Sequence, residues 1–173
     1  MAIRREDTND GKGLAHLVFP AASVLLVMAI IISTGLEWGS LSVQHRLVVA
    51  ETGVGEWQGV AVLITSVIGL LAMGLALAVG RRALAAAAVL VTGLVVVVMA
   101  FAEVVHLATR PQKIADVVGA AADSIPLKGY LMPLIESSVG AGTWLALLAG
   151  ALLFLVGLVA LVAPVWQARH SGH

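Results

Sequence analysis

Glu51-Thr-Gly-Val-Gly-Glu-Trp57 leads directly into a long apolar stretch, and Glu136-Ser-Ser-Val-Gly-Ala-Gly-Thr-Trp144 leads into another. Each motif is preceded by an apolar segment of its own that ends in a glutamate, Glu37 in the first case and Glu103 in the second. The chain therefore predicts two membrane hairpins of the same design in tandem. An internal duplication explains the repeat, but tryptophan is also enriched at membrane interfaces generally, so both explanations stay open.

The composition excludes an ordinary soluble domain. Of the 173 residues, 60% are hydrophobic and only 12% are charged, and the mean hydropathy is +1.03. Because a membrane-spanning helix needs roughly 20 apolar residues, the sequence predicts an all-α membrane protein with four transmembrane helices. We expect these helices at about residues 14–36, 58–80, 83–107 and 139–163. They form a transmembrane domain over residues 14–164, between polar tails at 1–13 and 165–173.

The first apolar segment is expected to stay in the protein as a transmembrane helix. Its apolar run is longer than the core of about 7–15 residues in a cleavable signal peptide, and its polar leader contains acidic residues.

The distribution of basic residues predicts the orientation. Both tails and the turn Gly80-Arg81-Arg82 carry six lysines and arginines, whereas the two loops on the other side carry four. The positive-inside rule then places both termini in the cytoplasm, with the chain in the plasma (inner) membrane. Seven of the ten acidic residues fall in the two outer loops.

Small residues recur at four-residue spacing in the second and fourth helices. In membranes such residues let helices approach closely, which is the main source of helix association there. We expect two packing stripes, whose partners lie in this chain or in another protein: Ala61, Thr65 and Gly69, and Gly142, Ala146 and Gly150.

The outer loops carry signs of local structure. Residues 40–48 begin with alternating apolar and polar side chains, which is typical of a short extended segment. In the second loop, Pro111 is placed to open a helix, and apolar residues then recur at helical spacing until Pro126. The pattern predicts a short amphipathic helix lying on the membrane surface or on the bundle.

Glu103 and His106 stand one helical turn apart and could share a metal ion, with Glu136 as a further carboxylate on the same side. The alternative is that these polar side chains at a helix end reach toward interfacial water. Because four-helix metal proteins use two such pairs and this chain has one, we expect no metal and no cofactor.

Several function classes are disfavoured by the sequence. The absence of cysteine excludes thiol chemistry and disulfides, and a formal net charge of zero gives no support for nucleic-acid binding. No hydrolase, metalloprotease or nucleotide-binding motif is present, so an enzyme is not expected. No ionisable residue lies at the middle of a predicted span, which disfavours an ion or proton transporter acting alone.

The layout resembles the small four-helix membrane proteins of unknown function from actinobacteria, of the tryptophan-associated type. The residues that carry the resemblance are the Gly-Val-Gly-Glu-Trp57 and Val-Gly-Ala-Gly-Thr-Trp144 helix starts and the Arg81-Arg82 turn, over residues 14–165. The resemblance implies the four-helix fold but no activity and no site residue.

The expected function is that of a non-catalytic accessory or assembly subunit of a larger membrane protein complex, respiratory or cell-envelope, that acts by helix packing and outer-loop contacts. Its expected partners are larger membrane subunits and the lipid bilayer, with a homo-oligomer as a further possibility. The alternative is a small-ligand or metal-binding sensor or permeation protein that uses the acidic outer face.

Overall fold

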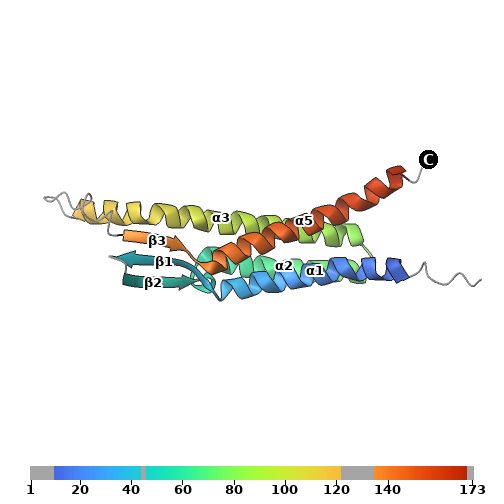
Figure 1. Ribbon diagram of the computed structural model, residues 1–173, viewed down its shortest axis with the longest axis horizontal. Coiled ribbons are helices and arrows are strands. Elements are labelled where there is room, and N and C mark those ends of the chain that lie inside the picture. The colour runs from blue at the N-terminus through green and yellow to red at the C-terminus, as the bar shows by residue number, and fades with distance from the viewer. Residues whose placement is uncertain (1–9, 44–45, 122–134, 171–173) are drawn as a thin grey trace, which may run out of the picture.

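The computed structural model describes residues 10–43, 46–121 and 135–170. Four long helices run side by side along one axis, and a small sheet lies at one end of them (Figure 1). The helices are α1 (Asp10–Thr34), α2 (Trp57–Ala78), α3 (Arg82–Ala121) and α5 (Ala141–His170). The remaining elements are β1 (Glu37–Val43), β2 (Arg46–Thr52), β3 (Ile135–Val139) and a 3₁₀ turn, η1 (Gly53–Gly55).

The prediction of a four-helix membrane protein is confirmed. Each of the four helices contains a segment long and apolar enough to cross a membrane: Leu17–Thr34, Trp57–Ala78, Arg82–Arg110 and Ala141–Pro164. The start of α1, the end of α5 and the α2–α3 turn lie at one end of the bundle, here named the turn end (Figure 1). The three strands lie at the opposite end, here named the sheet end.

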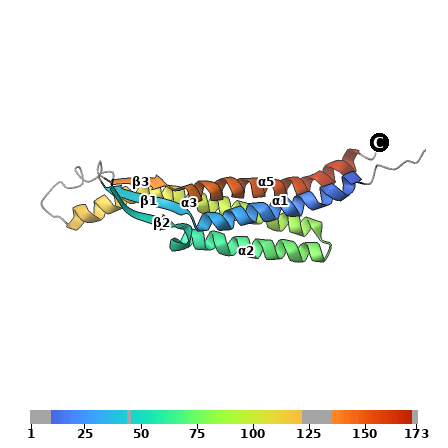
Figure 2. The ribbon, with the colours of Figure 1, turned by 60° about the horizontal axis from the view of Figure 1, so that its bottom comes forward.

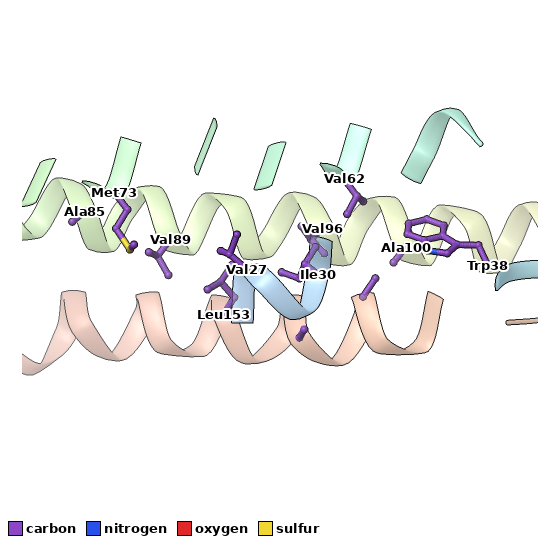
Figure 3. Packing of buried hydrophobic residues seen from close by; sticks show 12 residues of the cluster. Val27, Ile30, Trp38, Val62, Met73, Ala85, Val89, Val96, Ala100 and Leu153 are labelled. Atoms are coloured by element: carbon purple, nitrogen blue, oxygen red, sulfur yellow. The ribbon is translucent and has the colours of Figure 1, made fainter. Parts of the chain in front are cut away.

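The helices form a ring in which each contacts two neighbours. α1 packs on α2 and α5, and α3 packs on α2 and α5, so that α2 and α5 lie diagonally opposite (Figure 2). Side chains from all four helices meet along the axis, and the buried row includes Val27, Ile30, Val62, Val96 and Leu153 (Figure 3).

Glycines bring α3 and α5 into the closest helix contact. A Cβ atom at Gly93 would lie 2.4 Å from the backbone nitrogen of Phe154, and one at Gly157 would lie 2.6 Å from that of Leu90. Because no side chain fits at such separations, these glycines let the two backbones touch. By contrast, a Cβ atom at Gly74 on α2 would meet nothing within 4 Å.

The sheet end is more ordered than the sequence suggested. The extended segment expected at residues 40–48 is part of an antiparallel hairpin of β1 and β2, and β3 joins β1 on its other side to give the order β2-β1-β3. Strand β3 was not expected, because its five residues pair with a segment almost one hundred positions earlier and carry little periodicity of their own.

The prediction of a separate amphipathic helix that begins at Pro111 is wrong. α3 instead continues without a break from Arg82 to Ala121, through Pro111. A proline has no N–H, which frees the carbonyl four residues earlier, here that of Leu107. The hydroxyl of Ser137 on β3 donates to this carbonyl at 2.9 Å, so the sheet supplies the hydrogen bond that the proline removes.

The ends of α1 and α5 differ less from the predicted boundaries. α1 starts at Asp10, inside the tail expected at residues 1–13, and α5 extends to His170, inside the tail expected at residues 165–173. The expected helix end at Pro126 lies outside the described residues.

We predict that Gly93→Ala lowers the stability of the bundle, by about 1–3 kcal/mol, because the new methyl group forces α3 away from α5. The measurement is the unfolding midpoint of the purified protein in mild detergent on titration with a denaturing detergent. Gly74→Ala is the matched control, since its methyl group enters open space and alanine is the better helix former. Equal midpoints for the two variants would contradict the close contact.

Candidate functional site

Trp38 joins the sheet to the bundle. In the β1–β2 ladder Glu37 pairs with Thr52 and Gly39 pairs with Glu51, so Trp38 is an extra residue that forms a β-bulge. A bulge redirects its side chain, and the indole of Trp38 is fully buried among the helix ends (Figure 3).

The polar groups of Trp38 are hydrogen-bonded to two helices. Its Nε1 donates to the carbonyl of Ser33, in the last turn of α1, at 2.7 Å. Its own carbonyl accepts from the backbone N–H of Gly140 at 2.8 Å and from the hydroxyl of Thr143 on α5 at 2.8 Å. One residue thus fixes the position of the sheet relative to α1 and α5.

The glycines of both sequence motifs surround this indole. A Cβ atom at Gly53 would lie 2.6 Å from Nε1 of Trp38, and one at Gly142 would lie 2.5 Å from Cδ1. The two motifs therefore share a structural task, which is to leave room for one tryptophan. Trp57 and Trp144, which end the motifs, are 66% and 54% exposed in the first turns of α2 and α5, as expected for side chains at a membrane interface.

Beside this joint lies an ionic cluster of Arg110, Glu51 and Glu56. The guanidinium of Arg110 on α3 binds both carboxylate oxygens of Glu51 on β2, with Nη2 at 3.0 Å from Oε1, and it also lies 3.5 Å from Glu56. Glu56 occupies the N-cap position of α2, directly before Trp57. The cluster therefore links α3 to β2 and to α2.

The two glutamates of the cluster differ in proton affinity. The hydrogen bonds from Arg110 lower the pKa of Glu51. A hydrogen bond shared with Glu51, together with burial and the negative charge of Glu51, raises the pKa of Glu56 to about 7. The pair thus favours one ionised and one protonated carboxyl near neutral pH.

Glu103 is fully buried, and neither of its carboxylate oxygens has a hydrogen-bond partner among the described residues. The expectation that this side chain reaches interfacial water is therefore wrong. Gln58, in the first turn of α2, is 6% exposed, and its Oε1 also has no partner there.

The structure does not assemble a metal centre from the predicted residues. His106 is half-buried one turn from Glu103, and Glu136 is exposed on β3. Within residues 10–43, 46–121 and 135–170, no three histidine or carboxylate side chains lie close enough together to hold a metal ion.

The predicted packing residues lie mostly between helices of this chain. Ala61 and Thr65 are half-buried on α2, and Ala146 is fully buried on α5. A Cβ atom at Gly69 would lie 2.0 Å from Oγ1 of Thr92, and one at Gly150 would lie 2.8 Å from Cγ1 of Val96, so both glycines face α3.

Three residues of the site were missed by sequence reasoning. From the sequence alone, Trp38 is interpreted as an interfacial tryptophan and Gln58 as the polar start of a helix. Arg110 is interpreted as one of the charged residues of the loop. Of the three, only Gln58 could have been recognised from the sequence, because a glutamine directly after an interfacial tryptophan places an uncharged polar group at the start of a membrane span.

No protein-family model matches the chain, and no curated protein matches it. The function is therefore argued from the geometry.

We predict that the thermal stability of the protein falls as the pH rises from 5.5 to 8. The folded-state pKa of Glu56, about 7, lies above its ordinary value of 4.5, so its contribution is complete below 4.5 and is lost as the pH rises through 7. The lowered pKa of Glu51 makes its contribution constant over this range, because it is lost only at more acidic pH.

The measurement is the midpoint of thermal unfolding in detergent at the two pH values. Glu56→Gln should make the dependence less steep, whereas Glu37→Gln, at an exposed position of the same end, should preserve it. A slope that is identical in wild type and Glu56→Gln would exclude Glu56 as its source.

Proposed function

We propose that this chain is a non-catalytic accessory or assembly subunit of a larger membrane protein complex, of the respiratory or cell-envelope kind. It contacts the larger subunits through its transmembrane helices and through its sheet end. The observation that carries the proposal is an open groove between α2 and α3 that has three alanines in its lining.

This groove lies toward the turn end and has a volume of ≈ 340 Å³. Its lining consists of three alanines, Ala72, Ala76 and Ala88, and of the larger side chains of Leu75, Val79, Arg81 and Leu84. Within the stripe of small residues on α2, Gly69 packs on Thr92 of α3. The stripe then continues toward the turn end to positions that face outward, such as Ala72. Because small residues permit close approach of a helix in lipid, this groove suits a transmembrane helix of a partner subunit.

A second groove, between α1 and α5, has a different lining. It measures ≈ 560 Å³ and is bordered mainly by larger side chains such as Phe19, Leu152, Leu155 and Val159. Flexible lipid chains adapt to such a surface, and the bilayer is its proposed occupant.

The sheet end provides the second proposed contact. α3 extends beyond its membrane-spanning segment, which ends at Arg110, as far as Ala121, and the sheet is fixed beside it by Trp38 and Ser137. A firmly joined extramembrane element can hold a partner at a defined angle to the membrane.

We further propose that the chain lies in the plasma membrane with both termini in the cytoplasm and the sheet end outside. The excess of basic residues at the turn end supports this orientation. The resemblance to small four-helix actinobacterial membrane proteins agrees with the proposal, and duplication of one hairpin would explain why both motifs supply glycines to Trp38.

We predict that Ala72→Leu reduces recovery of the larger subunits by tenfold or more when the tagged protein is purified from its host in mild detergent. The added side chain fills the α2–α3 groove, and a tenfold loss corresponds to about 1.4 kcal/mol. The readout is quantitative mass spectrometry of bound proteins.

Ala163→Leu is the matched control, since Ala163 is an exposed alanine of the α1–α5 groove. Recovery of the wild-type chain alone would sink the accessory role. Equal partner recovery with both variants would move the contact away from the α2–α3 groove.

The orientation is testable because the chain has no cysteine. We predict that a single cysteine at Glu136 is labelled by a membrane-impermeant maleimide in intact cells, and that one at Arg81 is labelled only after the membrane is opened. Both positions are exposed, so the difference reports the side of the membrane. The reverse pattern would invert the proposed topology.

A small-ligand or metal-binding sensor or permeation protein is the second candidate. It is favoured by the buried and unpartnered carboxyl of Glu103.

A further inference from the structure

Glu103 stands on the face of α3 that forms the core of the bundle. Val96, Ala100 and Leu107 lie on the same face, and all three are buried. The carboxyl group of Glu103 therefore points toward other helices and not toward lipid or water.

The charged groups nearest to Glu103 do not neutralise it. Arg110, two turns further along α3, binds Glu51 of β2 and Glu56 at the start of α2. His106 is one turn away on the same helix and makes no described hydrogen bond to the carboxyl. An ionised carboxylate in such surroundings is strongly unfavourable, because burial removes its water and no described residue replaces it.

Gln58 lies opposite Glu103 across the α2–α3 interface. The two helices are antiparallel, and Gly69 contacts Thr92. Gln58 is eleven residues from Gly69 toward the sheet end, and Glu103 is eleven residues from Thr92 in the same direction. Eleven residues are about three helical turns, so this register sets both side chains at one level and on the facing sides.

Three acceptor oxygens thus lack a donor in one buried region, two from Glu103 and one from Gln58. A proton bound to Glu103 removes the negative charge and turns one acceptor into a hydroxyl donor, for which the Gln58 oxygen is the natural acceptor. One bound proton therefore removes the buried negative charge and supplies a hydrogen-bond donor to the Gln58 oxygen.

We propose that Glu103 and Gln58 form a buried proton-binding site, in which Glu103 takes up one proton to become a neutral carboxylic acid that donates to Gln58. The proton enters from the sheet end, where Glu51, Glu56, Arg110 and His106 lie between Glu103 and water. Binding changes the charge of the site from −1 to 0 and involves no other reactant. The site does not depend on the accessory role, because partner recovery and proton occupancy are separate measurements.

Infrared spectroscopy of the purified full chain in lipid nanodiscs tests the site, since a protonated carboxyl has a carbonyl band distinct from that of a carboxylate. At pH 7.5 we expect this band in the wild type and its loss in Glu103→Gln. Glu56→Gln should keep it, which separates Glu103 from Glu56, whose pKa is about 7. Gln58→Leu should keep the band but move it to higher frequency, because the hydrogen bond to the acid is removed.

Two outcomes would overturn the proposal. The first is a wild-type spectrum at pH 7.5 that is unchanged by Glu103→Gln while that variant keeps its native circular dichroism and elution. The second is loss of the Glu103 band when sodium replaces choline at constant pH, which would assign the three oxygens to a monovalent cation. A Gln58→Leu band at the wild-type frequency would remove Gln58 from the site.

Discussion

The burial of the Trp38 indole at a β-bulge is the constraint on which the sheet end depends. Hydrogen bonds from this residue reach the last turn of α1 and the start of α5, and the glycines of both sequence motifs leave space around its ring. Where water is excluded, backbone polar groups need partners within the protein. The Trp38 carbonyl, which accepts two hydrogen bonds, and the Ser137 hydroxyl on the Leu107 carbonyl meet this need where helices and strands join.

The bundle is packed differently along its length. Toward its middle, Gly93 and Gly150 bring α3 and α5 into contact, and Gly69 seats α2 on Thr92. Toward the turn end the ribbon of α5 bends away from that of α1 (Figure 1), and α5 contains Pro164. The open grooves lie on this half, whereas Gln58 and Glu103, whose buried oxygens have no partner among the described residues, lie near the sheet end. Surfaces suited to helix or lipid contact and groups suited to proton binding are thus spatially separated.

Hydropathy alone was sufficient to predict the four helices, because about 20 consecutive apolar residues have few alternatives to a membrane span. The strands were harder, since β3 is defined by pairing with β1 and not by its own five residues. Pro111 was misread for a related reason. The helix continues through it, and Ser137, which is distant in sequence, donates a hydrogen bond to the freed carbonyl. Glu103 was expected near water, but it lies on the core-facing side of α3 and is fully buried, which its local sequence does not reveal.

The length of α3 has a mechanical consequence. With 40 residues the helix is about 60 Å long, roughly twice the thickness of the hydrocarbon core that its first part crosses. It acts as a lever whose fulcrum is the glycine contact with α5. The arm from Gly93 to Ala121 is about 42 Å long, so a change in tilt of about 10° within the membrane would carry the far tip sideways by roughly 7 Å. Small changes in lipid thickness or in the packing of a neighbouring subunit would thus be amplified into displacements large enough for a second protein to sense.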